Sequence, residues 1–162
     1  MSVDIDAQHS NDVLAALHTL RHQRNAFIID LLETVMHTVL NGRGIYPARC
    51  FDHVWVYGVQ SPVCRHPEVA GWIRKQLEAA RPLLAAASSQ RAAVERAVIA
   101  VLDPSGSRTI ERYVFDLRSA GYDVTASCEA SLMSEAEFDV RALLLRLGLV
   151  LCYWNSRCLP RA

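Results

Sequence analysis

A cysteine, a histidine and a glutamate lie close together in the stretch CRHPE, from Cys64 to Glu68. Cysteine and histidine side chains ligate zinc, so Cys64 and His66 could form half of a metal site. A tetrahedral site needs four ligands, and the remaining candidates, Cys152 and Cys158, are not spaced as a close second pair. We therefore expect no structural metal, with Cys64 packed in the interior and His66 shaping the start of a helix.

Nucleophilic catalysis has equally little support in the sequence. No serine or cysteine stands in the context of a nucleophile elbow, and the histidines that could act as bases are scattered along the chain. A small enzyme that uses Cys50, Cys64 or His66 is an alternative, but no spacing of these residues favours it. We expect no enzymatic activity and no cofactor.

Trp72 is the remaining candidate for a functional side chain. It falls on a predicted helix whose inner stripe is formed by Val69, Ile73 and Leu77. Trp72 lies about 100° around the helix axis from Ile73, at the border of that stripe. A tryptophan at such a border is either a half-buried part of the core or an anchor for a partner peptide. The sequence leaves both interpretations open.

The sequence predicts three helices, and Trp72 lies on the second. The first, over residues 24–41, has apolar residues at helical spacing and ends at the glycines of NGRG. The second, over residues 67–81, has a proline at its first position and is expected to end or kink at Pro82. The third, over residues 134–151, opens with the capping box SEAE.

The strands are predicted between these helices. Residues 50–59 are rich in aromatic and β-branched residues, which favours one extended segment that ends near Pro62. Residues 95–102 and 108–117 flank the turn sequence DPSGS and are predicted to form a β-hairpin. In the second strand of this hairpin, Tyr113, Phe115 and Leu117 should share one face because side chains alternate along a strand. The expected fold class is α+β.

Composition limits the class of protein. The chain has 162 residues, of which 51% are hydrophobic and 21% charged, as in a globular protein, and its formal net charge of zero gives no overall attraction to nucleic acids. The most apolar run, residues 142–154, is too short to span a bilayer and contains Arg146. No signal peptide is evident, and the odd cysteine count of five favours reduced thiols.

Residues 1–21 are expected to form a flexible N-terminal extension to one domain, residues 22–162.

Several short motifs occur in an order that resembles the HORMA domain family. They are IYPARCF, YGV, HPE at the start of a helix and PLL at its end, followed by VERAVIAVLD and IERYVFDL in the predicted hairpin. The resemblance covers roughly residues 24–150. It implies three helices packed on an antiparallel sheet. It also implies a noncatalytic adaptor, in which a C-terminal seat belt closes around an extended peptide of a partner protein.

The resemblance also implies roles for individual residues. Trp72 matches an aromatic residue that lines the peptide channel, and Tyr46 and Pro47 are expected to contribute to peptide binding. Arg141 and Arg146, on the third helix, are expected to support a homodimer or heterodimer of HORMA proteins. The sequence ends at CYWNSRCLPRA, where the family continues with another strand and the seat belt, so we expect a C-terminally truncated domain.

Within the family, the resemblance is greatest to the accessory subunit of DNA polymerase zeta. It implies a partner peptide from the polymerase catalytic subunit, a role in translesion synthesis and DNA damage tolerance, and a location in the nucleus and also the cytoplasm. A spindle-checkpoint or meiotic chromosome-axis HORMA protein is the alternative, with the same fold and a different partner. Neither interpretation requires direct contact with nucleic acid or with a membrane.

Overall fold

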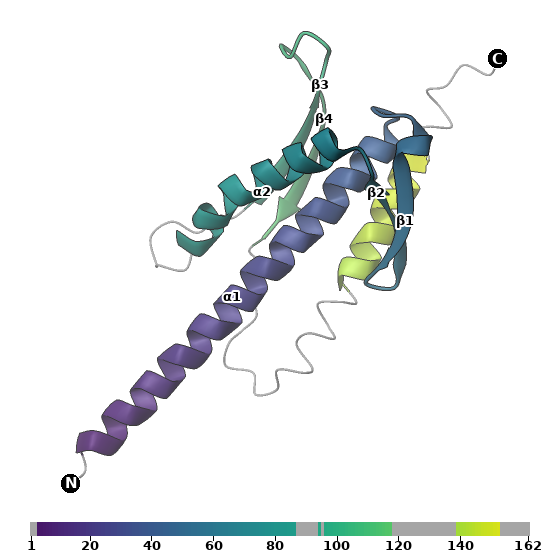
Figure 1. Cartoon of the computed structure of the whole chain (residues 1–162). Coiled ribbons are helices and arrows are strands. Elements are labelled where there is room, and N and C mark those ends of the chain that lie inside the picture. The colour runs from purple at the N-terminus through teal and green to yellow at the C-terminus, as the bar shows by residue number, and fades with distance from the viewer. Residues whose placement is uncertain (1–2, 87–93, 95, 118–138, 153–162) are drawn as a thin grey trace, which may run out of the picture.

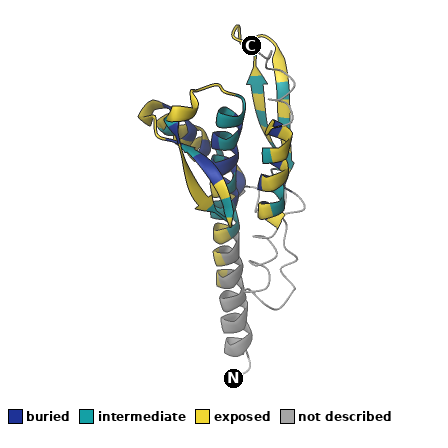
Figure 2. Cartoon of the chain, turned by 90° about the vertical axis from the view of Figure 1, so that its right-hand side faces the viewer, coloured by how far each residue is buried: buried dark blue, intermediate teal, exposed yellow. Residues whose placement is uncertain are grey.

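The computed structural model describes residues 3–86, 94, 96–117 and 139–152. The elements in chain order are α1 (Val3–Gly42), the 3-10 turn η1 (Ala48–Cys50), β1 (Phe51–Val56), β2 (Val59–Cys64), α2 (Pro67–Ala86), β3 (Arg96–Leu102) and β4 (Thr109–Asp116). A further helix, here called the C-terminal helix, covers residues 139–152. In Figure 1, α1 runs between α2 and the C-terminal helix; in Figure 2, the two hairpins lie on opposite sides of α1.

The first helix is longer than predicted. It begins at Val3 rather than near Arg24, so residues 3–21, which were expected to belong to an N-terminal extension, are part of the same helix α1. Residues 3–24 contain no glycine or proline, and therefore no strong local signal interrupts the helix. The division of the chain into an extension of residues 1–21 and a domain of residues 22–162 stays a prediction.

One face of α1 forms a first hydrophobic cluster with α2 and the β1–β2 hairpin. The predicted inner stripe of α2 is confirmed, since Val69, Ile73 and Leu77 are all buried. Cys64 is buried in the same cluster, as expected. The buried members are Ile28, Ile29, Leu32, Phe51, Cys64, Val69, Ile73, Leu77, Leu84 and Leu117.

A second face of α1 forms another cluster with the C-terminal helix. Its buried members are Val35, Val39, Val140, Leu144, Leu147 and Leu151, and residues of β3 and β4 pack against them. The two helices approach closely at Gly42, where an added Cβ would lie 2.7 Å from Leu151 Cδ1. Glycine at this position therefore permits the close packing, and a larger side chain would push the C-terminal helix away.

The single strand predicted over residues 50–59 is wrong, because the chain turns back at Tyr57 and Gly58. Their φ angles are 49° and 70°, the positive values of a two-residue hairpin turn. Glycine adopts this conformation freely, whereas tyrosine rarely does. The Tyr57 ring packs edge-on against Phe27 with 5.3 Å between centroids, which helps to hold it. Pro62 lies inside β2, opposite His53, rather than ending the segment.

The β3–β4 hairpin is confirmed. In β4, Tyr113 and Phe115 face the second cluster while Arg112 and Val114 are exposed. The described strands form two separate two-stranded antiparallel sheets, β1–β2 and β3–β4. The α+β class and the three helices agree with the HORMA-like fold that we expected. The predicted absence of a further strand and seat belt stays a prediction.

Two other boundaries follow from the structure. α2 begins at Pro67 as predicted, but Pro82 lies within the helix, which continues to Ala86. The capping box predicted for the third helix lies outside the described residues.

No helix in the described ranges is both long enough and apolar enough to cross a membrane.

A buried histidine joins α1 to the end of β2. The His37 side chain is 2% exposed, and its Nδ1 accepts a hydrogen bond of 3.2 Å from the backbone N–H of Cys64. Burial lowers the pKa of His37 below its ordinary value of 6.5, and the nearby Glu33 opposes this shift. The imidazole must be neutral at Nδ1 to accept, so the contact belongs to the unprotonated form.

An ion pair joins the end of α1 to β4. The Arg43 Nε lies 2.7 Å from Glu111 Oε2 and 2.9 Å from the Tyr113 hydroxyl oxygen. The Tyr113 hydroxyl in turn donates to Glu111 at 2.8 Å. Burial and the Glu111 carboxylate raise the pKa of Tyr113, so the phenol stays protonated as the donor. The three side chains form one closed network between two elements distant in sequence.

We expect stability to fall in mild acid because of His37. The unfolded chain binds a proton near pH 6.5, whereas the folded imidazole binds it only at lower pH. Protonation therefore favours unfolding as the pH falls below about 6.5. The measurement is the thermal midpoint between pH 7.5 and 5. His37→Asn keeps an acceptor and should flatten this part of the profile, whereas His53→Asn, at an exposed position, should not.

Removing the charge of Arg43 should destabilise the fold. Arg43→Met keeps the apolar stem but leaves Glu111 as a partly buried carboxylate without this cation, which we expect to lower the free energy of unfolding by about 2 kcal/mol. Chemical denaturation measures the change. Arg81→Ala breaks an exposed pair with Glu78 and should change stability by less than about 0.5 kcal/mol. Equal effects of the two variants would contradict the structural role of the network.

Candidate protein-interaction site

Trp72 lies on the outer side of α2 and is 52% exposed. An exposure of 52% is compatible with both interpretations that the sequence left open, a half-buried part of the core and an anchor for a partner peptide, so the role of Trp72 stays a prediction. Leu83, three turns later on the same side of the helix, is 61% exposed. With the exposed Gln76 and Ala79 these residues form a narrow stripe, here called the α2 ledge. At a rise of 1.5 Å per residue, its two large apolar side chains are separated by roughly 16 Å along the axis.

The α2 ledge borders a charged side of the same helix. Lys75 lies about 60° around the axis from Trp72 and is exposed. Farther round, Arg81 donates to the carboxylate of Glu78 at 2.9 Å, so its charge is partly matched. An apolar stripe with a cation beside it can bind a peptide that carries apolar anchors and an acidic side chain.

Tyr46 and Pro47 lie between α1 and β1. Tyr46 is 36% exposed, and Pro47 is the exposed residue that precedes η1. No described hydrogen bond or ring contact connects either residue with Trp72. Their participation in one peptide site with Trp72 therefore stays a prediction.

Arg141 and Arg146 are both exposed on the C-terminal helix. The guanidinium of Arg141 lies over the β1–β2 turn, with Nη1 3.5 Å from the position of a Cβ on Gly58. Beside these arginines the helix carries an exposed apolar group, here called the outer stripe, formed by Leu145 at 51%, Leu149 at 71% and Val150 at 47% exposed. The two arginines thus flank apolar surface, although their role in dimerisation stays a prediction.

Sequence reasoning missed Trp55. It lies on β1 and is 74% exposed, and its neighbour Val54 is 41% exposed on the other face of the strand. A strand with alternating aromatic and aliphatic residues is expected to bury one face. In this hairpin only β2 lies against α1, so β1 is largely exposed on both faces. The tryptophan itself could have marked this position as a candidate recognition residue. Its exposure, however, depends on which strand of the hairpin contacts α1.

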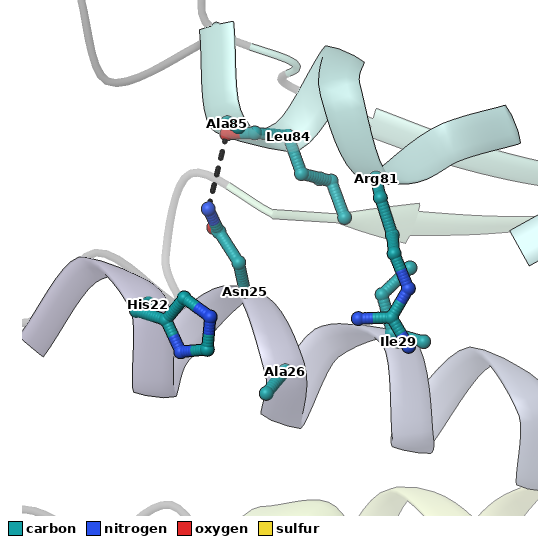
Figure 3. A pocket seen from close by; sticks show the side chains of 7 residues that line it. All are labelled: His22, Asn25, Ala26, Ile29, Arg81, Leu84 and Ala85. Atoms are coloured by element: carbon teal, nitrogen blue, oxygen red, sulfur yellow. Dashed lines mark hydrogen bonds between the residues drawn. The ribbon is translucent and has the colours of Figure 1, made fainter. Parts of the chain in front are cut away.

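A shallow pocket lies between α1 and the last turns of α2 (Figure 3). Ala26, Ile29, Leu84 and Ala85 supply its apolar surface, and His22, Asn25 and Arg81 supply its polar groups. Asn25 Nδ2 donates a long hydrogen bond of 3.4 Å to the carbonyl of Leu84, in the last turn of α2. The side chain of Asn25 thus ties the end of α2 to α1.

The described residues offer little for catalytic or metal chemistry. Within the part of the chain that the structure describes, no three His, Cys, Asp or Glu side chains are grouped so that they could hold a metal ion. Cys50, Cys64 and Cys152 are free thiols there. The expected lack of metal, cofactor and enzymatic activity stays a prediction. What the geometry does provide is exposed apolar surface next to charged groups, which suits protein recognition.

Comparison with known proteins gives relatives that include several proteins named MAD2B. The chain is 28% identical over 121 residues to the human mitotic spindle assembly checkpoint protein MAD2B, covering 75% of this chain and 54% of that protein. The chicken protein of the same name is 29% identical over 119 residues, and the zebrafish protein 25% over 121. The chain therefore spans about half the length of these relatives.

A solved structure supports the fold. A chain in the crystal structure of a mitotic checkpoint complex superposes with a TM-score of 0.61 at 20% identity, covering 85% of this chain and 66% of that chain. No family model matches the sequence. The structural likeness concerns the fold alone, whereas the sequence similarity to the proteins named MAD2B extends over three quarters of the chain.

Proposed function

We propose that this chain, a HORMA-family homologue of the proteins named MAD2B, is a noncatalytic adaptor that binds a peptide segment of a partner protein. The observation that carries the proposal is the exposure of Trp72, 52% of whose surface is free on the outer side of α2. Tryptophan is enriched among the residues that dominate binding energy at protein interfaces. A half-exposed tryptophan aligned with an exposed leucine forms apolar surface that a bound peptide would cover.

For the partner we favour a catalytic subunit of DNA polymerase zeta, with a role in DNA damage tolerance and a location in the nucleus and also the cytoplasm. The order of the motifs from residue 24 to 150 supports this choice. Tyr46 and Pro47 would extend the peptide site from Trp72. The proposal includes no cofactor and no direct contact with nucleic acid or membrane.

A role in the spindle checkpoint is the second candidate. It is favoured because the relatives are named as mitotic spindle assembly checkpoint proteins, and because the solved structure with a similar fold is a mitotic checkpoint complex. The fold is the same for both candidates, and so is the peptide-binding mode. A meiotic chromosome-axis protein would differ again only in its partner.

Identification of the bound proteins separates these candidates. The tagged 162-residue chain is used to capture partners from cell extract, which mass spectrometry then identifies. A polymerase catalytic chain supports the first candidate, and a checkpoint or axis protein supports the second. Capture is repeated with Trp72→Ala, and only proteins lost with this variant count as ligands of the α2 ledge.

Trp72→Ala should weaken peptide binding more than it weakens the fold. We expect the affinity for a captured partner's peptide to fall by about 2 kcal/mol or more, as for an interface hot spot. Because the side chain is half exposed, the free energy of unfolding should change by no more than about 1 kcal/mol. Calorimetric titration and chemical denaturation measure the two quantities. A fully destabilised variant, or unchanged peptide affinity, would refute the role of Trp72.

The outer stripe should mediate association between HORMA proteins. Leu149→Glu places a charge in the middle of its apolar surface and should shift the chain toward monomer, as measured by analytical ultracentrifugation across protein concentrations. Arg146→Ala should act in the same direction, because Arg146 is exposed beside the outer stripe. Asp139→Ala, exposed at the start of the same helix, is the matched control. A monomer at all concentrations for the unsubstituted chain would count against self-association.

A further inference from the structure

The pocket between α1 and α2 lies on a different side of α2 from the α2 ledge. Arg81 is located about 180° around the helix axis from Trp72, so one side chain of a partner cannot contact both sites at once. Two helices line the pocket. The residues of α1 are His22, Asn25, Ala26 and Ile29, and those of α2 are Arg81, Leu84 and Ala85. Nothing in the proposed peptide-binding function uses these residues.

Each polar side chain of the pocket, His22, Asn25 and Arg81, has at least one hydrogen-bond donor. Arg81 uses its Nε for Glu78, while its two terminal nitrogens make no hydrogen bond with any described residue. Figure 3 shows Arg81 reaching from α2 toward α1 above Ile29, with Asn25 across the pocket from it. None of the seven described residues that line the pocket carries a carboxylate, and Glu78, which binds Arg81 Nε, is not among them. The forked guanidinium geometry is suited to binding a carboxylate through two parallel hydrogen bonds.

The remaining surface of the pocket is apolar and small. Ile29 and Leu84 are 3% and 7% exposed, so they form a fixed floor rather than mobile side chains. The cavity volume is about 160 Å³. This is below the roughly 300–1,000 Å³ that a drug-sized ligand or cofactor requires. The space is sufficient for one side chain, which indicates an anchor point within a larger protein contact.

We propose that this pocket binds a glutamate side chain of a partner protein. The methylene groups of the glutamate would lie against Ile29 and Leu84. The carboxylate would accept hydrogen bonds from the terminal nitrogens of Arg81 and from Asn25. Binding here would add a second contact to the partner on the side of α2 opposite Trp72, and it does not depend on what the α2 ledge binds.

The test is a nuclear magnetic resonance titration of the full chain with the pentapeptide acetyl-Ala-Ala-Glu-Ala-Ala-amide. We expect saturable shifts of the Asn25 side-chain amide and the Arg81 Nε–H signals. The same peptide with glutamine in place of glutamate should give no saturable shift. Arg81→Gln, which removes the guanidinium charge but keeps a polar side chain, should weaken binding of the glutamate peptide at least fivefold.

Arg74→Gln is the matched control, since Arg74 is exposed two turns earlier on the same side of α2 and outside the pocket. It should bind the glutamate peptide as the unsubstituted chain does. Equal shifts with the glutamine peptide, or equal weakening by the two arginine variants, would overturn the proposal. Saturation by inorganic phosphate with no response to the glutamate peptide would overturn it as well, because the site would then recognise charge alone.

Discussion

The fold depends on the burial of two separate faces of α1. One face, with Ile28 and Leu32, is covered by α2 and the β1–β2 hairpin, and the other, with Val35 and Val39, is covered by the C-terminal helix. Each of these side chains is less than 10% exposed. Burial of apolar surface is the main stabilising term in folding. Without α1, neither cluster would have the helix face on which its other members pack.

This central role of α1 explains where the candidate recognition surfaces lie. The elements around it each turn one face inward, so their remaining apolar residues stay on the outside of the molecule. Trp72 and Leu83 on α2, Trp55 on β1, and Leu149 on the C-terminal helix all lie on such outer faces. The pocket at Arg81 instead lies at the junction of α1 and α2, where two packed helices diverge near the end of α2. The described part of this chain therefore offers several separate surfaces for contact with other proteins.

Local sequence signals predicted part of this arrangement. Pro67 at the first position of α2 and the DPSGS turn of the β3–β4 hairpin act through backbone geometry alone, so both were predictable. The turn at Tyr57 was missed because a non-glycine residue at positive φ is held by its contact with Phe27, which is distant in sequence. The position of Trp72 on the helix was predicted, but its exposure depends on what packs beside α2. The pocket could not be predicted, since its walls come from two helices whose spacing is set by tertiary packing.

The separation of the two clusters along the chain has a consequence for synthesis on the ribosome. Among the described residues, the buried members of the first cluster end at Leu117, whereas the second includes members from Val140 to Leu151. At roughly 5–20 residues per second, a few seconds pass between translation of these two segments. During that interval Val35 and Val39 have no C-terminal helix to cover them. The apolar surface of Val35 and Val39 therefore has to stay exposed, or be covered by another protein, until the last helix has been made.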